Sequence, residues 1–279
     1  MKILVTGYKG QLGYDVVNEA TVRGIEAVGV DIDEMDITDA TSVEMVIKEG
    51  NYDAVVHCAA WTAVDKAEDE IALCTKVNVE GTRNIALVCE ALDIPMMYFS
   101  TDYVFDGLGK EEWQEYGDRK PLNVYGQTKY EGELEVERLK KHFIIRISWV
   151  FGVNGNNFIK TMLRLGKERG AVSVVNDQVG APTYTFDLAK LVVDMIQTEK
   201  YGTYHATNEG NCSWYEFACE IFKQAGLEVE VTPIDSKAFP VKATRPKNSR
   251  MSKIELDKKG FDRLPTWQDA VGRYLAEIL

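Results

Sequence analysis

The chain has few cysteines and histidines and no hydrophobic run long enough to cross a bilayer. The cysteines form no CxxC pair, and no histidine lies near enough to two of them to suggest a metal site. They are Cys58, Cys74, Cys89, Cys212 and Cys219. We interpret them as reduced thiols of a cytoplasmic protein without a bound metal. The apolar start, MKILVTG, is too short for a signal peptide.

Basic residues are also in deficit, because 32 lysines and arginines face 44 aspartates and glutamates, a net charge of −12. Nucleic acids and membrane surfaces bind basic patches, so neither is an expected partner. One stretch is different: residues 236–253 contain six lysines and arginines and no acid. This stretch could face a small anionic ligand, although a solvated basic loop is the simpler interpretation.

Short apolar runs alternate with helical patterns in the first half of the chain. The runs cover residues 2–7, 26–32, 53–60, 95–100 and 143–151, and helices are expected at 11–24, 41–50 and 71–93. A capping box of Thr41 and Glu44 is predicted to begin the second helix. This alternation predicts an α/β fold of the Rossmann type, a doubly wound parallel sheet that binds ligands at the carboxyl ends of its strands.

The second half of the chain has a looser pattern. Helices are expected at 156–170, 185–200 and 213–226, the last beginning with a capping box of Ser213 and Glu216, and shorter proline-containing segments lie between them. We therefore predict a dinucleotide-binding domain at 1–151 and a smaller α/β substrate lobe at 152–279. Part of 183–208 is expected to rejoin the first domain. The crevice between the lobes is the expected ligand site.

Gly7, Gly10 and Gly13 follow the first apolar run as GxxGxxG. A tight turn at the start of a helix brings backbone N–H groups and the helix dipole to a pyrophosphate, although glycines also serve plain turns. Asp31 ends the second run, where an acid can bind the adenosine ribose and repel the 2′-phosphate of NADP. This position favours NADH and leaves NADPH open, and a simple turn residue is the alternative.

Tyr125 and Lys129 are four residues apart, a spacing that any helix brings to one face. Ser100 and Thr101 end the fourth apolar run and are expected at the same sheet edge. A hydroxyl can hold a carbonyl oxygen, and a phenol can protonate it. A nearby ammonium can lower the pKa of the phenol toward neutrality. Together these residues predict a site that reduces a ketone.

The motifs HCAAWTAVDKAE, STDYVFDG, NVYGQTK, RISWVFG, GNNFIKTML, NDQVGAPT and RPKNSR, with the glycine triplet, extend this prediction. The chain resembles the extended short-chain dehydrogenase/reductase superfamily and, within it, the dTDP-4-dehydrorhamnose reductases. The resemblance runs from Lys2 to about Ser252. It implies reduction by NADH, or by NADPH, of the 4-keto group of a dTDP-sugar to give dTDP-L-rhamnose.

The resemblance also implies roles for single residues. Thr101, Tyr125 and Lys129 match the catalytic set, and Tyr125 and Lys129 also bind the cofactor. The other implied cofactor-binding residues are Gly7, Gly10, Gln11, Leu12, Gly13, Asp31, Asp36, Ile37, Ala59, Ala60, Trp61 and Thr62. The implied substrate-binding residues are Thr101, Asp102, Trp149, Asn157 and Arg245.

Four other functions are considered, of which the first is disfavoured. A sugar-nucleotide 4,6-dehydratase usually has Asp followed by Glu after the catalytic hydroxyl, whereas Asp102 is followed here by Tyr103. A 4-epimerase, or a reductase of another 4-ketosugar nucleotide, would share the same residues. A non-catalytic subunit, like the regulatory subunit of methionine adenosyltransferase, is the alternative from a different class. The oligomeric state, including a homodimer, also stays open.

Overall fold

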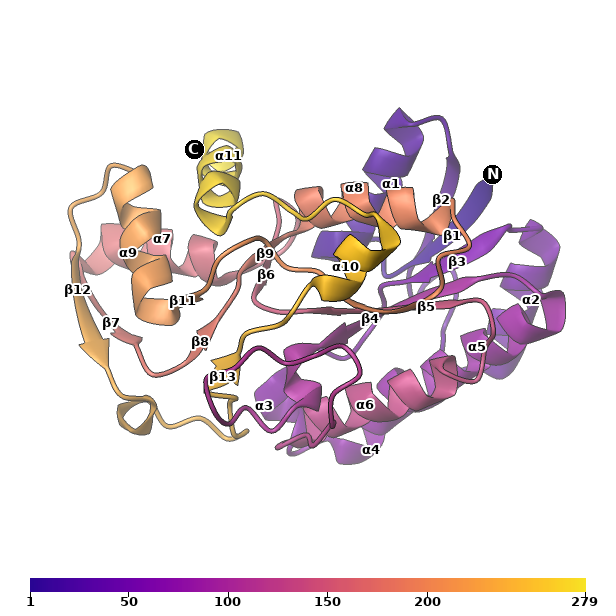
Figure 1. The fold of residues 1–279 in the computed structure, drawn as a ribbon, viewed down its shortest axis with the longest axis horizontal. Helices are drawn as coiled ribbons and strands as arrows, with labels where there is room; N and C mark the ends of the chain where they lie inside the picture. The colour runs from indigo at the N-terminus through magenta and orange to yellow at the C-terminus, as the bar shows by residue number, and fades with distance from the viewer.

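The computed structural model describes all 279 residues and contains a six-stranded sheet whose strands are all parallel (Figure 1). The strand order is β10-β5-β4-β3-β1-β2. The strands are β1 (Lys2–Thr6), β2 (Glu26–Val30), β3 (Ala54–His57), β4 (Met96–Thr101), β5 (His142–Ile147) and β10 (Gly202–His205). The first five coincide with the predicted apolar runs, which confirms the doubly wound parallel sheet.

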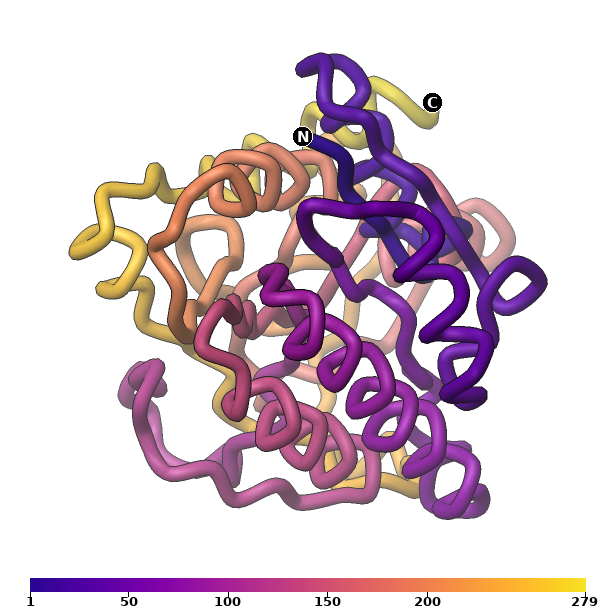
Figure 2. The backbone as a smooth tube through the Cα atoms, turned by 90° about the vertical axis from the view of Figure 1, so that its right-hand side faces the viewer, coloured from indigo at the N-terminus to yellow at the C-terminus, as the bar shows by residue number.

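Helices cover both faces of this sheet (Figure 1). Helices α1 (Gln11–Val22) and α8 (Thr185–Ile196) pack on one face, and α2 (Ala40–Gly50), α5 (Gly81–Leu92) and α6 (Val124–Val136) pack on the other. Figures 1 and 2 both show α5 and α6 side by side. Helix α8 and strand β10 come from residues 185–205. Segments from the second half of the chain therefore complete the large sheet and its helical cover. The domain boundary at residue 151 stays a prediction.

A second lobe is formed by α7 (Phe158–Arg169), α9 (Trp214–Gln224) and α11 (Trp267–Ile278) around its own apolar core. Its strands β7 (Ala171–Val175) and β12 (Glu230–Ile234) pair in parallel. A three-stranded sheet has the order β11-β8-β13. These strands are β11 (Cys212–Ser213), β8 (Val179–Gly180) and β13 (Asn248–Ser249).

Short elements complete the fold. Residues 71–92 form a nearly continuous helix, as predicted, from α4 (Ile71–Thr75) through the π-helical turn η1 (Lys76–Glu80) to α5. The others are α3 (Val64–Ala67), η2 (Asp102–Val104), β6 (Val150–Phe151) paired with β9 (Thr183–Tyr184), η3 (Ser236–Ala238) and α10 (Ile254–Lys259). None of the helices has both the length and the apolar composition that a bilayer-spanning segment needs.

The two predicted capping boxes have different outcomes. Ser213 and Glu216 cap α9 reciprocally, as expected. The box of Thr41 and Glu44 is wrong, because Asp39 is the N-cap residue of α2 and accepts from the backbone N–H of Thr41. The N-cap therefore lies two residues earlier than predicted, at an aspartate, which is also favoured at this position.

Candidate active site

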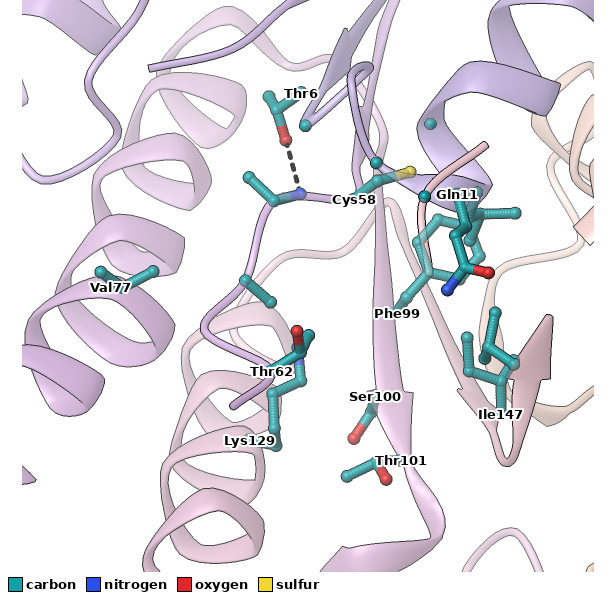
Figure 3. Close-up of a pocket in the computed structure, with 18 of the residues that line it drawn as sticks. Thr6, Gln11, Cys58, Thr62, Val77, Phe99, Ser100, Thr101, Lys129 and Ile147 are labelled. Atoms are coloured by element: carbon teal, nitrogen blue, oxygen red, sulfur yellow. Dashed lines mark hydrogen bonds between the residues drawn. The ribbon is translucent and has the colours of Figure 1, made fainter. Parts of the chain in front are cut away.

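A cavity of about 770 Å³ lies at the carboxyl ends of the large sheet's strands. Residues that follow β1, β2, β3, β4 and β5 line it, and so do residues of α6 and of the second lobe. The strand order changes direction between β1 and β3, and doubly wound sheets bind nucleotides at such a point. Figure 3 shows part of this lining.

The glycine loop joins β1 to α1 at one end of the cavity. Gly7 has a φ of +65°, and a Cβ atom there would lie 2.7 Å from the backbone nitrogen of Ala59. Only glycine therefore allows β1 and β3 to approach so closely. Gly10 is the N-cap residue of α1, and the first turn contains no acid. The first N–H groups of the helix can thus receive an anion.

Gln11, Leu12 and Gly13 also line the cavity. The Gln11 side chain reaches the second lobe, where its Oε1 accepts from the backbone N–H of Gly152 at 2.9 Å and from Asn157 Nδ2 at 3.2 Å. The loop that faces the cavity is therefore attached to both lobes.

Asp31 lines the cavity at the end of β2, and Asp36 and Ile37 lie beside it. The carboxylate of Asp31 accepts from the backbone N–H groups of Lys9, at 3.3 Å, and Ile32, at 2.9 Å. The Nζ atom of Lys9 lies 2.8 Å from Asp33 and 3.7 Å from Glu34. A cation is thus present at the expected adenosine end.

Beyond β3, Ala59, Ala60 and Thr62 line the cavity, as expected for a flat ligand that lies close to the backbone. Trp61 is not among the lining residues. Its indole N–H donates to the Ala63 carbonyl at 3.1 Å, and its backbone N–H donates to Asn78. The backbone of Trp61 is thus bound to Asn78 of η1 and its indole to its own loop, and its contact with the cofactor stays a prediction.

Thr101, Tyr125 and Lys129 all line the same cavity. Thr101 is the last residue of β4, and Tyr125 and Lys129 lie one turn apart in α6, which Asn123 caps by accepting from the Gly126 N–H at 2.8 Å. Figure 3 shows Ser100, Thr101 and Lys129 around one space. The Oγ atom of Ser100 is buried without a hydrogen-bond partner.

Burial shifts the pKa values of Lys129 and Tyr125. It lowers the pKa of Lys129 from 10.5 to about 7, with Glu133 opposing the shift. It raises the pKa of the Tyr125 phenol well above its usual range, with the Thr101 side chain opposing the shift. The role of Lys129 in lowering the Tyr125 pKa stays a prediction, because desolvation of the phenol is the largest effect in this structure. Desolvation of the phenol outweighs its neighbours, so Tyr125 carries its proton at neutral pH.

Asp102 is buried beside Thr101, whose hydroxyl donates to its Oδ1 at 3.0 Å. Ser249 of β13 donates to its other oxygen. Burial raises the pKa of Asp102 to about 6, and these hydrogen bonds oppose the shift. Tyr103, which the sequence analysis did not assign to the site, also lines the cavity and packs edge-on against Tyr125 at 5.5 Å. The sequence did contain a signal for Tyr103, because this residue lies in the motif STDYVFDG.

The remaining candidates come from the second lobe. Trp149 lines the cavity. Asn157 is not among the lining residues, and the two hydrogens of its Nδ2 are shared among the Gln11 side chain, the Gly152 carbonyl and the Tyr274 hydroxyl. Arg245 lies at the edge rather than in the lining, with its guanidinium 2.6 Å from Asp65 and 3.3 Å from the Tyr103 hydroxyl.

The basic stretch 236–253 is largely neutralised within the chain. Four of its cations have acidic partners: Lys242 pairs with Asp69, Arg245 with Asp65, Lys247 with Asp177 and Lys253 with Glu209. A solvated loop therefore describes only part of the stretch, because Asn248–Ser249 form β13 and Lys253 is buried. Arg245 is the member that also contacts a cavity residue, Tyr103.

This fold and this cavity are those of a nucleotide-binding oxidoreductase of the extended short-chain dehydrogenase/reductase type. More narrowly, the chain belongs to the RmlD substrate binding domain family, whose model matches residues 1–279.

Individual relatives agree with this assignment. The chain is 38% identical to dTDP-4-dehydrorhamnose reductase of Salmonella typhimurium, over 100% of this chain and 98% of that protein. It is 37% identical to the spore coat polysaccharide biosynthesis protein SpsK of Bacillus subtilis, over 99% and 97%. A solved dTDP-4-dehydrorhamnose reductase from Bacillus anthracis, in complex with NADP, is 42% identical with a TM-score of 0.97 and coverage of 99% and 100%.

Proposed function

We propose that the chain reduces the 4-keto group of dTDP-4-dehydro-L-rhamnose to give dTDP-L-rhamnose, with NADH or NADPH as the reductant. The observation that carries this proposal is that Thr101, Tyr125 and Lys129 line one cavity with the glycine loop and Asp31. The family relatives are named for this reaction.

The residues present fit a dinucleotide. The N-terminus of α1 offers N–H groups to a pyrophosphate, Asp31 offers a carboxylate to ribose hydroxyls, and Ala59 and Ala60 leave room beside β3. When bound, the nicotinamide supplies the hydride that reduces the keto carbon. Lys129, one turn from Tyr125, would hold the nicotinamide ribose.

The chain's own residues handle the oxygen and its proton. For the reaction, the Thr101 hydroxyl turns its single proton from Asp102 to the keto oxygen and donates a hydrogen bond there as negative charge develops. Tyr125 then donates its phenolic proton to that oxygen, which becomes the 4-hydroxyl. The raised pKa keeps this proton on Tyr125 until the alkoxide, a much stronger base, forms.

Substrate binding is proposed for Asp102, Trp149 and Tyr103, which line the cavity beside Thr101, and for Arg245 at its edge. An arginine there can bind a diphosphate with two parallel hydrogen bonds. Asn157 is proposed instead as a structural link between the lobes.

The direct test is NADH and NADPH oxidation, followed by absorbance, with dTDP-4-dehydro-L-rhamnose as substrate. We expect turnover in the wild type and a loss of at least about a hundredfold in Tyr125→Phe, which keeps the ring but has no proton to donate. Both proteins should bind NADH equally. Interconversion of sugar epimers without net NADH oxidation would instead indicate an epimerase. Absence of turnover together with a stable complex with a second enzyme would indicate a regulatory subunit.

Two further points belong to this proposal. A cytoplasmic location is proposed because all five cysteines are free, as is usual for proteins of a reducing compartment. We also propose that the protein forms a homodimer. Light scattering, which measures the molar mass in solution, tests this proposal.

A further inference from the structure

Trp149 has an unusual backbone conformation. Its φ is +50°, one of three positive values among the non-glycine residues, and a bulky residue rarely adopts this conformation. The turn it makes directs the chain from β5 into β6, and its indole forms part of the cavity wall. Such a conformation persists only where the surrounding structure determines it.

Three residues outside the cavity lining contact the indole: Trp214, Phe217 and Gly180. The ring of Trp214 stacks on it, with 3.7 Å between centroids and 15° between planes, and Phe158 packs against Trp214 at 4.6 Å. Gly180 also contacts it, since a Cβ atom at this position would lie 3.1 Å from the Cε2 atom of Trp149. The Trp149 carbonyl accepts from the Thr183 N–H at 3.2 Å.

These supports belong to one small sheet. Strand β11 pairs with β8, so that Cys212 lies opposite Gly180, and it leads directly to Trp214, the first residue of α9. The capping box of Ser213 and Glu216 fixes that start. On the other side of β8, β13 presents Ser249, which donates to Asp102. The sheet β11-β8-β13 therefore contacts two residues of the substrate end, Trp149 and Asp102.

We propose that Trp214 is a positioning residue for the sugar end of the substrate. It fixes the plane of the Trp149 indole by stacking and so controls how tightly the hexose is bound, without touching the substrate itself. The proposal rests on the function given above, in which Trp149 contacts the sugar.

The test compares Trp214→Ala and Trp214→Phe with Trp267→Phe as the matched control. Trp267 is also the first residue of a capped helix, α11, in the same core, and it packs edge-on against Phe217 rather than on Trp149. Three properties are measured: the circular dichroism couplet that stacked indoles give in the far ultraviolet, the steady-state constants, and calorimetric binding of dTDP-L-rhamnose and of dTDP alone.

In Trp214→Ala we expect loss of the couplet and a rise of roughly tenfold in KM for the ketosugar nucleotide, with the KM for NADH unchanged. Affinity for dTDP-L-rhamnose should fall by the same factor, while affinity for dTDP should not change. Trp214→Phe should restore most of the sugar affinity. Trp267→Phe should keep both the couplet and the sugar affinity, whatever its thermal stability.

Loss of the couplet with unchanged sugar affinity would overturn the proposal. So would an equal loss of affinity for dTDP, dTDP-L-rhamnose and NADH, because that result indicates general loosening. If Trp214→Ala does not fold, Trp214→Leu, which keeps apolar bulk but removes the stacking ring, takes its place in the same comparison of sugar and dTDP binding. The couplet and the binding data do not depend on turnover, so failure of the proposed reaction is recognised separately, as absence of activity in the wild type.

Discussion

Lys129 is only 3% exposed, and its Nζ lies 4.1 Å from the centre of the Tyr98 ring. Its charge is therefore supported mainly by a ring face and by Glu133, one turn further along α6. Sequence reasoning found the residue types of this site, because spacing and strand ends place them. It did not find their protonation, because the degree of burial of each group depends on segments distant in the sequence.

The substitution Lys129→Met should inactivate the enzyme and stabilise it. Burial lowers the Lys129 pKa from 10.5 to about 7, so the unfolded chain binds the extra proton between these pH values. Below pH 7 the wild type has the full cost of a buried cation, and we expect the variant to be more stable by up to about 4 kcal/mol. This advantage should shrink as pH rises from 7 toward 10.5. Urea unfolding across this range measures it, and parallel pH curves for the two proteins would contradict it.

Lys9 is predicted to support the use of NADPH. Asp31 disfavours a 2′-phosphate, and Lys9 is the cation whose backbone N–H already binds Asp31 and whose Nζ lies beside Asp33. By rotating, Nζ can pair with the phosphate. Lys9→Ala should lower kcat/KM for NADPH roughly tenfold and leave NADH nearly unchanged, while Lys9→Arg should keep both. Equal losses with both cofactors would show that Lys9 acts on the loop instead.

Elements were predicted well where their pattern is local. The five long apolar runs became β1 to β5, and the capping residues Ser213 and Glu216 begin α9. The last run was expected to continue to Phe151 as one strand, but the chain turns at Trp149 and continues as β6. The two-residue strands β8, β11 and β13 gave no signal, because their pairing depends on partners more than 30 residues away.

The joint between α6 and β5 contains a buried ion pair. Arg146 Nε lies 2.7 Å from Glu133 Oε1, and its Nη2 lies 2.8 Å from Oε2, with both residues almost fully buried. Arg146→Met leaves the buried Glu133 carboxylate with Arg119, 2.8 Å from Oε2, as its remaining cationic partner, so we expect a loss of up to about 3 kcal/mol in the free energy of unfolding. The double variant Glu133→Leu with Arg146→Met should recover much of it. Additive losses in urea unfolding would contradict this coupling.

At the scale of the whole molecule, side chains far apart in the sequence join the two lobes. Gln11 and Tyr274 both accept from Asn157, and Asp65 pairs with Arg245 across 180 residues. The sequence predicted two lobes and a crevice, since composition and pattern change after residue 151. It could not predict these joints, because a polar residue in a loop gives no indication of its partner. Asn157 and Arg245, both expected on the substrate, are hydrogen-bonded within the protein in this structure, and their contact with the substrate stays a prediction.

Arg245 has two candidate partners, Asp65 and the diphosphate of the substrate. The carboxylate of Asp65 is 44% exposed, so its pairing with Arg245 is weak enough for a doubly charged group to replace it. Asp65→Asn removes the competing charge, and we expect KM for the dTDP-sugar to fall roughly threefold. Arg245→Ala should raise it roughly tenfold or more, and the double variant should match Arg245→Ala. Asp69→Asn, which affects only the neighbouring pair with Lys242, is the matched control. If Asp65→Asn instead raises KM as much as Arg245→Ala does, the pair is a structural joint that must stay closed, and Arg245 does not bind the diphosphate.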